Sequence, residues 1–299
     1  MSATPGWIPV SATADVPFEP AAPGVGRRRG VLRGVLGTPS GLLGAALTGT
    51  LVVVAVFAPA LAPYDPFAID GPVLHPPSVA HPLGTDALGR DLYSGVLYGT
   101  RTSLVVAGTV GVLVLLIGAL VGAVSGYAGR WADDVLMRLT EAFQVLPRFF
   151  LAIVVIAFFG PGIDRLVLVL GFTSWPMLAR VVRAEVLSLK QREFIAAAKA
   201  HGASNVRVVV REILPNALPA AIALLGLVLA QVILIEASLG FIGLGDPNAM
   251  SWGYLANEAQ RFLRVAWWLP LFPGLAILLA VLGLNLLGDA LTDILGGRR

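Results

Sequence analysis

Six long apolar segments, separated by short polar ones, run through the sequence. They lie at roughly 41–62, 104–127, 139–159, 166–182, 220–240 and 269–287. Each is close to the roughly 20 residues that a helix needs to cross the hydrocarbon core of a bilayer. A backbone in lipid must satisfy its own hydrogen bonds, which favours helices. The pattern therefore predicts an all-α membrane protein with six transmembrane helices.

The third segment carries an unusual charge at Arg148, and we expect Pro147 to kink its helix. The polar segments divide the rest of the chain. The expected parts are a disordered basic arm at 1–40, a first transmembrane helix at 41–63, an extracytoplasmic segment at 64–100 that ends in a short amphipathic piece, a five-helix core at 101–292 with a polar loop at 190–219, and a tail at 293–299.

The distribution of Lys and Arg gives an orientation. With six spans and the amino terminus inside, 16 of the 21 Lys and Arg residues fall on the cytoplasmic side. The five expected outside are Arg90, Arg101, Arg165, Arg261 and Arg264. Cytoplasmic loops are the ones enriched in Lys and Arg, so we expect both termini to be cytoplasmic. The basic cluster Arg27–Arg29 then flanks the membrane, and we expect no nucleic-acid partner.

Composition supports a membrane protein. The chain of 299 residues is 57% hydrophobic and only 13% charged, whereas soluble domains carry about 25% charged residues. It contains no cysteine, which excludes disulfides, thiolate nucleophiles and Cys-ligated metals.

The polar loop from Glu193 to Pro219 reads as two helices. Residues 193–201 are helix formers, and Gly202 fits a helix C-terminal break. Ser204 or Asn205 then caps a second helix at 206–214, which we expect Pro215 to end. The prediction is a short helix-turn-helix on the inner membrane surface, with its apolar edge packed on the spans.

Sites for chemistry are few. The carboxylate pairs Glu185 with Glu193, and Asp133 with Asp134, are open as acid–base candidates, but solvated surface charge explains them better. His75 and His81 lie six residues apart without a third ligand at metal spacing, and His201 fits a helix end. No phosphate-binding loop is present. We therefore expect neither catalytic residues nor a bound metal or cofactor.

Ionisable and polar residues inside spans are functional candidates by default. The candidate pathway-lining residues are Gln231, Glu236 and Asn285. For Glu236, solvation near the outer interface or a bond to a neighbouring helix is an equally good explanation. Small residues recur along the second span and indicate close helix packing; they are Gly108, Gly111, Gly118, Gly122 and Gly126.

The polar loop resembles the EAA loop of ABC-type import permeases. The matching positions are Ala197, Ala198, Gly202, Leu214 and Pro215. Ala196 stands where the family has Glu, and the nearest acid is Glu193. Glu212 stands where the family has Ile. We therefore expect any contact of this loop to depend on shape and on Gly202, Arg207 and Arg211.

A second resemblance narrows the family. Residues 81–94, HPLGTDALGRDLYS, followed by GTRTSL at 99–104, resemble the segment after the first span in the C-subunit type of dipeptide/oligopeptide/nickel permeases. The residues that carry it include Gly84, Thr85, Asp86, Gly89, Arg90 and Asp91. Phe241–Gly245 and the pair Trp252-Gly253 are also similar to that family.

The resemblance implies the type I ABC importer permease fold. It also implies a non-enzymatic subunit of an ATP-driven peptide importer in the cytoplasmic membrane. The implied partners are a second permease subunit in a heterodimer, two cytoplasmic ATPases that dock on the loop, and an extracytoplasmic substrate-binding protein. Nickel chelates or glutathione remain alternative cargoes. An ion-coupled secondary transporter is the alternative mechanism, and the scarcity of buried acids argues against it.

Overall fold

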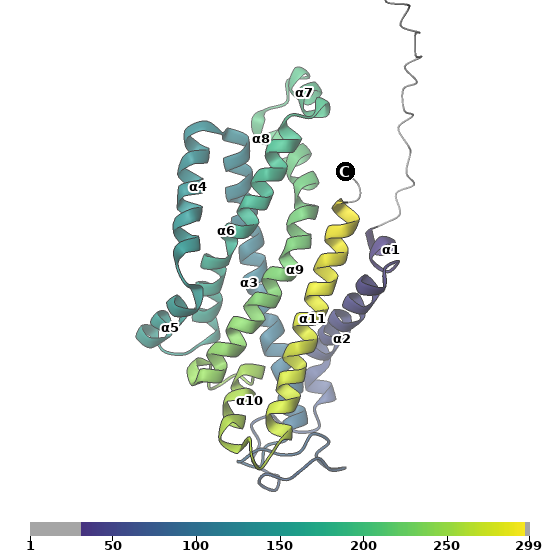
Figure 1. Ribbon diagram of the computed structural model, residues 1–299, viewed down its shortest axis with the longest axis vertical. Coiled ribbons are helices and arrows are strands. Elements are labelled where there is room, and N and C mark those ends of the chain that lie inside the picture. Colours follow the sequence, from purple (N-terminus) through teal and green to yellow (C-terminus); the bar gives the residue numbers. More distant parts are fainter. Residues whose placement is uncertain (1–30, 297–299) are drawn as a thin grey trace, which may run out of the picture.

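The computed structural model describes residues 31–296, and this part of the chain contains helices and no β-strand. In chain order the elements are α1 (Val31–Val35), α2 (Pro39–Leu61), α3 (Leu92–Ala128), α4 (Arg130–Val145), α5 (Arg148–Phe159), α6 (Ile163–Lys190), α7 (Glu193–Ala200), α8 (Asn205–Arg207), η1 (Val208–Ile213), α9 (Leu214–Leu239), η2 (Gly240–Leu244), α10 (Trp252–Ala259), η3 (Gln260–Phe262) and α11 (Trp268–Gly296). The long helices stand side by side (Figure 1). One end of the bundle carries α1, α7 and α8, and the other carries α10 and the segment that follows α2.

Five helices are long and apolar enough to cross a membrane. They are α2, α3, α6, α11 and the continuous helical stretch Asn205–Leu244. The helices α4 and α5 pass the same test only together, as one broken span. The prediction of an all-α membrane protein is confirmed, with five such helices and the bent pair α4 and α5 as the candidate for the sixth.

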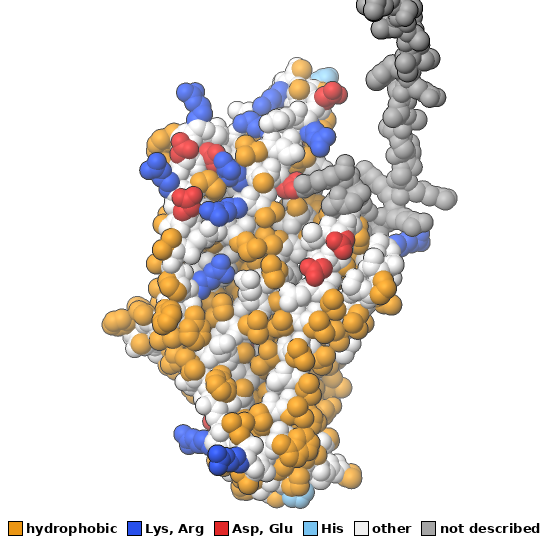
Figure 2. All heavy atoms as spheres, in the orientation of Figure 1, with side chains coloured by type: hydrophobic (Ala, Val, Ile, Leu, Met, Phe, Trp, Pro, Cys, Tyr) orange, Lys and Arg blue, Asp and Glu red, His pale blue; other side chains and the backbone are white. Residues whose placement is uncertain are grey.

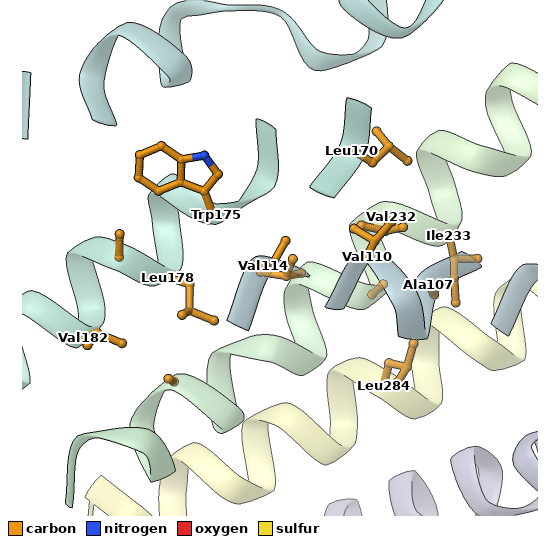
Figure 3. Packing of buried hydrophobic residues seen from close by; sticks show 14 of the residues in the cluster. Ala107, Val110, Val114, Leu170, Trp175, Leu178, Val182, Val232, Ile233 and Leu284 are labelled. Atoms are coloured by element: carbon orange, nitrogen blue, oxygen red, sulfur yellow. The ribbon is translucent and has the colours of Figure 1, made fainter. Parts of the chain in front are cut away.

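The centre of the bundle is the packing of α3 against α6 and α9. Ala107, Val110 and Val114 of α3 meet Leu170, Trp175, Leu178 and Val182 of α6, and Val232 and Ile233 of α9, in one apolar cluster (Figure 3). Glycines let α3 approach its neighbours. An added Cβ at Gly122 would lie 2.5 Å from the Ala179 carbonyl oxygen, and Gly111, Gly118 and Gly126 are similarly crowded. Gly108 faces open space, so it is not a packing position.

The kink predicted at Pro147 in the third span is found, but it divides the segment into two separate helices. The axes of α4 and α5 differ by 75°. Leu146 has extended backbone angles, because proline at the next position disfavours the helical region. Pro147 also lacks the N–H that would continue the hydrogen-bond ladder. The polar stretch between the predicted segments 104–127 and 139–159 is helical as well, since α4 begins at Arg130.

The prediction that Pro215 ends a helix is wrong as well. The turns at Val208–Ile213 are π-helical, and the N–H of Leu214 bonds to the carbonyl of Val209, five residues earlier. Pro215 is the second residue of α9, directly after this π-helical stretch. The helix therefore continues without interruption from the polar loop into the span.

The ends of other elements also differ from the sequence prediction. Residues 92–100 form the first turns of α3 instead of a separate piece. Within the arm predicted for 1–40, α1 and the start of α2 are helical, and residues 1–30 lie outside the described part. The tail predicted from 293 is helical to Gly296, where the described part ends.

Candidate functional site

The polar loop forms a compact hairpin, here called the coupling hairpin and defined as Glu193–Ile213. Its first limb is α7, and its turn is centred on Gly202. The N–H of Gly202 bonds to the Lys199 carbonyl at 2.9 Å, and the N–H of Ala203 bonds to the Ala198 carbonyl at 3.1 Å. This pair of bonds is the Schellman arrangement, and it needs a positive φ at the turn residue. Gly202 supplies it with a φ of 80°.

The second limb begins at a capped end. The Ser204 hydroxyl accepts the N–H of Arg207 at 3.4 Å, so Ser204 is the cap, as one of the two predicted candidates. The limb passes through η1 directly into α9. The second limb is therefore joined to α9 by helix, with no intervening loop.

The two faces of the coupling hairpin differ sharply. The inner face is apolar and packs into the main core, with Ile195, Val208 and Ile213 buried. The outer face exposes Phe194 at 43%, Val206 at 73% and Val210 at 55%. Val206 and Val210 line one hollow with Arg207 and Arg211, and apolar patches rimmed by polar residues often mark sites of protein–protein or membrane contact.

The sequence-predicted residues of the hairpin distribute over these faces. The exposed ones are Glu193, Ala197, Gly202, Arg207, Arg211 and Pro215. Ala198 and Leu214 are partly buried against the core. Arg207 and Arg211 line one surface hollow of about 420 Å³ together with Ser204, Val206 and Val210. The hairpin and its buried apolar edge are confirmed as predicted.

Tyr127 anchors the hairpin, and the sequence analysis missed it. This residue lies at the last turn of α3, and its hydroxyl donates to the Asn205 side chain at 2.6 Å. Lys190 and Lys199 each place their ammonium group over its ring, at 5.3 and 5.2 Å from the centroid. Lys190 also donates to the Tyr127 carbonyl at 2.6 Å. In the sequence, Tyr127 is a tyrosine at the end of a predicted span. Tyrosines are common at membrane interfaces, so this position alone does not indicate a contact with the hairpin.

At the opposite end of the bundle, the motif at 84–91 forms a buried polar network. Asp86 accepts from Arg90 Nε at 2.5 Å and from the N–H groups of Leu88 and Arg90 at 2.8 Å each. Arg90 also donates to the Tyr254 hydroxyl at 3.0 Å and to Glu258 at 3.4 Å, both on α10. The network fixes the segment before α3 to a helix more than 160 residues away in the sequence.

Burial by itself lowers the pKa of Arg90, but the hydrogen bonds to Tyr254 and Asp86 and the charge of Asp86 outweigh it, so that the pKa of Arg90 lies above its ordinary value. The guanidinium therefore stays charged and needs its acceptors. Thr85 and Asp91 complete the network. Trp268 of α11 donates to the Thr85 carbonyl at 3.2 Å. Asp91 caps α3 through Ser94 and lies 2.9 Å from His81 Nδ1.

Comparison with known proteins identifies the chain. The family described as "Binding-protein-dependent transport system inner membrane component" matches residues 115–299. The dipeptide transport system permease protein DppC of Alkalihalophilus pseudofirmus is 37% identical over 257 residues, covering 85% of this chain and 84% of that protein. The chain belongs to this family.

Other similar proteins agree with this assignment. The probable D,D-dipeptide transport system permease protein DdpC of Escherichia coli is 37% identical over 262 residues, covering 87% of this chain and 88% of that protein. The glutathione transport system permease protein GsiD of Pectobacterium atrosepticum is 40% identical over 250 residues, covering 82% of each.

The fold is similar to that of a solved structure. The MetNI methionine ABC transporter, in inward-facing form, matches with a TM-score of 0.55 and 20% identity, covering 69% of this chain and 96% of that chain. The permease therefore has the type I importer fold and is a multi-pass protein of the cytoplasmic membrane. Its family is one of transport subunits, which work with partner proteins in a binding-protein-dependent system.

The candidate pathway residues of the permease do not form one site. Glu236 is buried in the packed contact between α9 and α3, where it accepts from Ser103 at 3.0 Å. Asn285 is partly buried on α11, and its Oδ1 has no hydrogen-bond partner among the described residues. Gln231 is partly buried on α9. For Glu236 the structure favours the second explanation from the sequence, a bond to a neighbouring helix.

One of the acid–base candidates, Asp133, lies in an ion pair. Asp133 of α4 pairs with Arg183 of α6 at 2.5 Å. Glu193 is exposed on the coupling hairpin. His75 Nδ1 lies 2.9 Å from the Pro76 carbonyl, and His201 Nδ1 lies 2.8 Å from the Ala197 carbonyl. Within residues 31–296, no group of three or more His, Asp and Glu side chains is arranged to hold a metal ion.

Proposed function

We propose that this permease imports short peptides, and that ATP hydrolysis on separate subunits drives it through the coupling hairpin. The observation that supports this most is the hairpin itself. Its inner face is buried in the core, its outer face exposes Phe194, Val206 and Val210, and it continues directly into α9. A surface of this kind suits a protein that receives force from a partner and passes it to the spans.

The orientation proposed from the charge distribution agrees with this role. Lys and Arg side chains gather at one end of the bundle, and few lie at the opposite end (Figure 2). The end rich in these residues is the one that carries α7 and the last turns of α11. Cytoplasmic surfaces are the ones enriched in these residues. The hairpin then faces the cytoplasm, where ATP is available, and the network at 84–91 faces the extracytoplasmic binding protein.

The proposed assembly is a heterodimer with a second permease subunit, two ATPase subunits below it and a binding protein above it. Nucleotide binding shifts the permease between states only if the ATPases bind the hairpin differently in each state. The hairpin contributes stiffness to this coupling. Its turn is fixed by two backbone bonds, and Tyr127 joins both of its limbs to α3 through Lys199 and Asn205.

Peptides are proposed as the cargo because two of the similar proteins are named for dipeptides and a third for glutathione, which is itself a small peptide. Glutathione is therefore a specific second candidate. Both belong in the same uptake assay, since a binding protein that selects the cargo is not part of this chain.

The complex, purified with its native partners and placed in proteoliposomes, is expected to accumulate labelled dipeptide only with ATP on the side of the hairpin. A non-hydrolysable nucleotide is expected to abolish accumulation, and a proton ionophore to leave it unchanged, because the energy comes from hydrolysis. Uptake that persists without ATP and collapses with the ionophore would instead show an ion-coupled secondary transporter.

A further inference from the structure

The helix α4 carries a charged face that no described element covers. Asp134, Arg138 and Glu141 follow one another at helical spacing, and Gln144 extends the row by one turn. All four of these side chains are exposed. Arg180 of α6 joins this face through an ion pair of 3.8 Å with Glu141. We call these five residues, together with Arg148, the polar wall.

The polar wall runs along the candidate broken span that α4 and α5 form. Gln144 lies 14 residues after the start of α4, which is about 21 Å along a helix axis. The hydrocarbon core is only about 30 Å thick. Charged side chains continue from the basic end of the molecule along the region of α4 (Figure 2). Charged residues within a membrane span face water or a polar partner because exposure to lipid is costly.

Arg148 stands where the wall ends. It is the first residue of α5, directly after the 75° bend at Leu146–Pro147. Its guanidinium is half-buried and makes no hydrogen bond or ion pair with any residue in the range 31–296. A partly buried cation without an anion is unfavourable unless water or a ligand supplies the missing acceptors. Arg138 likewise has no ion pair within that range.

We propose that the polar wall lines the aqueous passage of the assembled importer, and that Arg148 binds the carboxylate of the cargo as it passes. This rests on the proposed function, in which the cargo is a peptide with a free carboxylate. Arg138, Arg148 and Arg180 outnumber Asp134 and Glu141 on the wall, which favours an anionic group. A guanidinium holds a carboxylate by two parallel hydrogen bonds, and Arg148 has all of its donors available.

The chain contains no cysteine, so single introduced thiols give a clean test. In nanodiscs that hold the whole complex, Gln144→Cys is expected to react about tenfold faster with a membrane-impermeant thiosulfonate than Leu116→Cys, since water-filled, charged clefts concentrate ionic reagents. Leu116 is a matched control because it is 63% exposed on an apolar face of α3. Labelling is read by the mass of this chain.

The same assay tests Arg148. Gln144→Cys is expected to prefer an anionic reagent over a cationic one by about threefold or more, with the preference weakening at high salt. Arg148→Gln is expected to remove that preference, and Arg148→Lys to keep it. The salt dependence of the reagent preference is measured with Arg148 intact. It therefore tests the positive charge of the wall even if Arg148→Gln does not assemble.

Two outcomes overturn the proposal. Gln144→Cys that is as unreactive as Leu116→Cys, with and without nucleotide, would show that the wall is covered by a partner subunit or by lipid. A reagent preference unchanged in Arg148→Gln, or absent at low salt, would remove the role of Arg148. Labelling requires no transport, so these outcomes are distinct from a failure of ATP-driven peptide uptake.

Discussion

Gly202→Val is expected to lower ATP-driven uptake by about tenfold, without preventing membrane insertion. Gly202 has a φ of 80° in the turn of the coupling hairpin. An L-residue in that left-handed region costs roughly 1–2 kcal/mol, and about 1.4 kcal/mol is a factor of ten in the population of the correct turn. The strain changes the turn that joins the two limbs, so that fewer molecules hold the hairpin in the shape proposed to contact the ATPase. Uptake in proteoliposomes measures the effect.

Gly160→Val is the matched control. Gly160 also has a φ of 80°, and an added Cβ meets no atom within 4 Å at either glycine. The ψ of Gly160 is 165°, in a region that is essentially restricted to glycine, so a valine there is strained at least as much as at Gly202. Gly160 lies between α5 and α6, at a distance from the hairpin in the bundle (Figure 1). Equal loss of uptake in both variants would show that strain alone is responsible, and full activity of Gly202→Val would show that the turn has no part in coupling.

Arg90→Ala is expected to destabilise the end of the bundle that carries α10 by about 3–5 kcal/mol, the range for breaking a buried ion pair from one side. The substitution leaves Asp86, only 6% exposed, without its cation, and removes the link to Tyr254 and Glu258 on α10. A lower unfolding temperature in detergent, with faster proteolysis of the segment between α2 and α3, measures the loss.

Arg101→Ala supplies the comparison for that result. Arg101 is exposed on the adjacent part of α3 and forms no ion pair with a described residue, so its removal is expected to change stability by less than about 0.5 kcal/mol. If the two variants unfold at the same temperature, the motif at 84–91 does not hold this end of the molecule together.

Much of the fold could be predicted from hydrophobic length and turn chemistry. The spans follow from long apolar runs, and the turn of the coupling hairpin follows from Gly202, because a positive φ is a local requirement of one residue. The bend between α4 and α5 was underestimated because Pro147 indicates where a helix breaks but not by what angle. That angle depends on tertiary contacts. The charged face of α4 also reads as a loop when only hydropathy is considered.

The candidate site could be predicted in part. Contacts between residues far apart in the sequence could not be predicted. Ser204 and Gly202 act on neighbours within a few residues, which sequence spacing reveals. Tyr127 reaches Asn205, and Arg90 reaches Tyr254, across long intervals that only the packing of α3 and α10 defines. Pro215 was misread because a π-helical turn before it lets the helix continue. Local rules therefore identify a motif but not its partners.

The central claim, that the outer face of the coupling hairpin docks on an ATPase subunit, is tested most directly by site-specific crosslinking. Val206→Cys, exposed at 73% on the hairpin, provides one thiol in a chain without cysteine, and Leu263→Cys, exposed at 57% at the opposite end, is its control. A short photoactivated crosslinker on Val206→Cys is expected to capture an ATPase subunit, and on Leu263→Cys to capture none. Absence of an ATPase crosslink at Val206, in a complex from which the ATPases still copurify, would contradict the account.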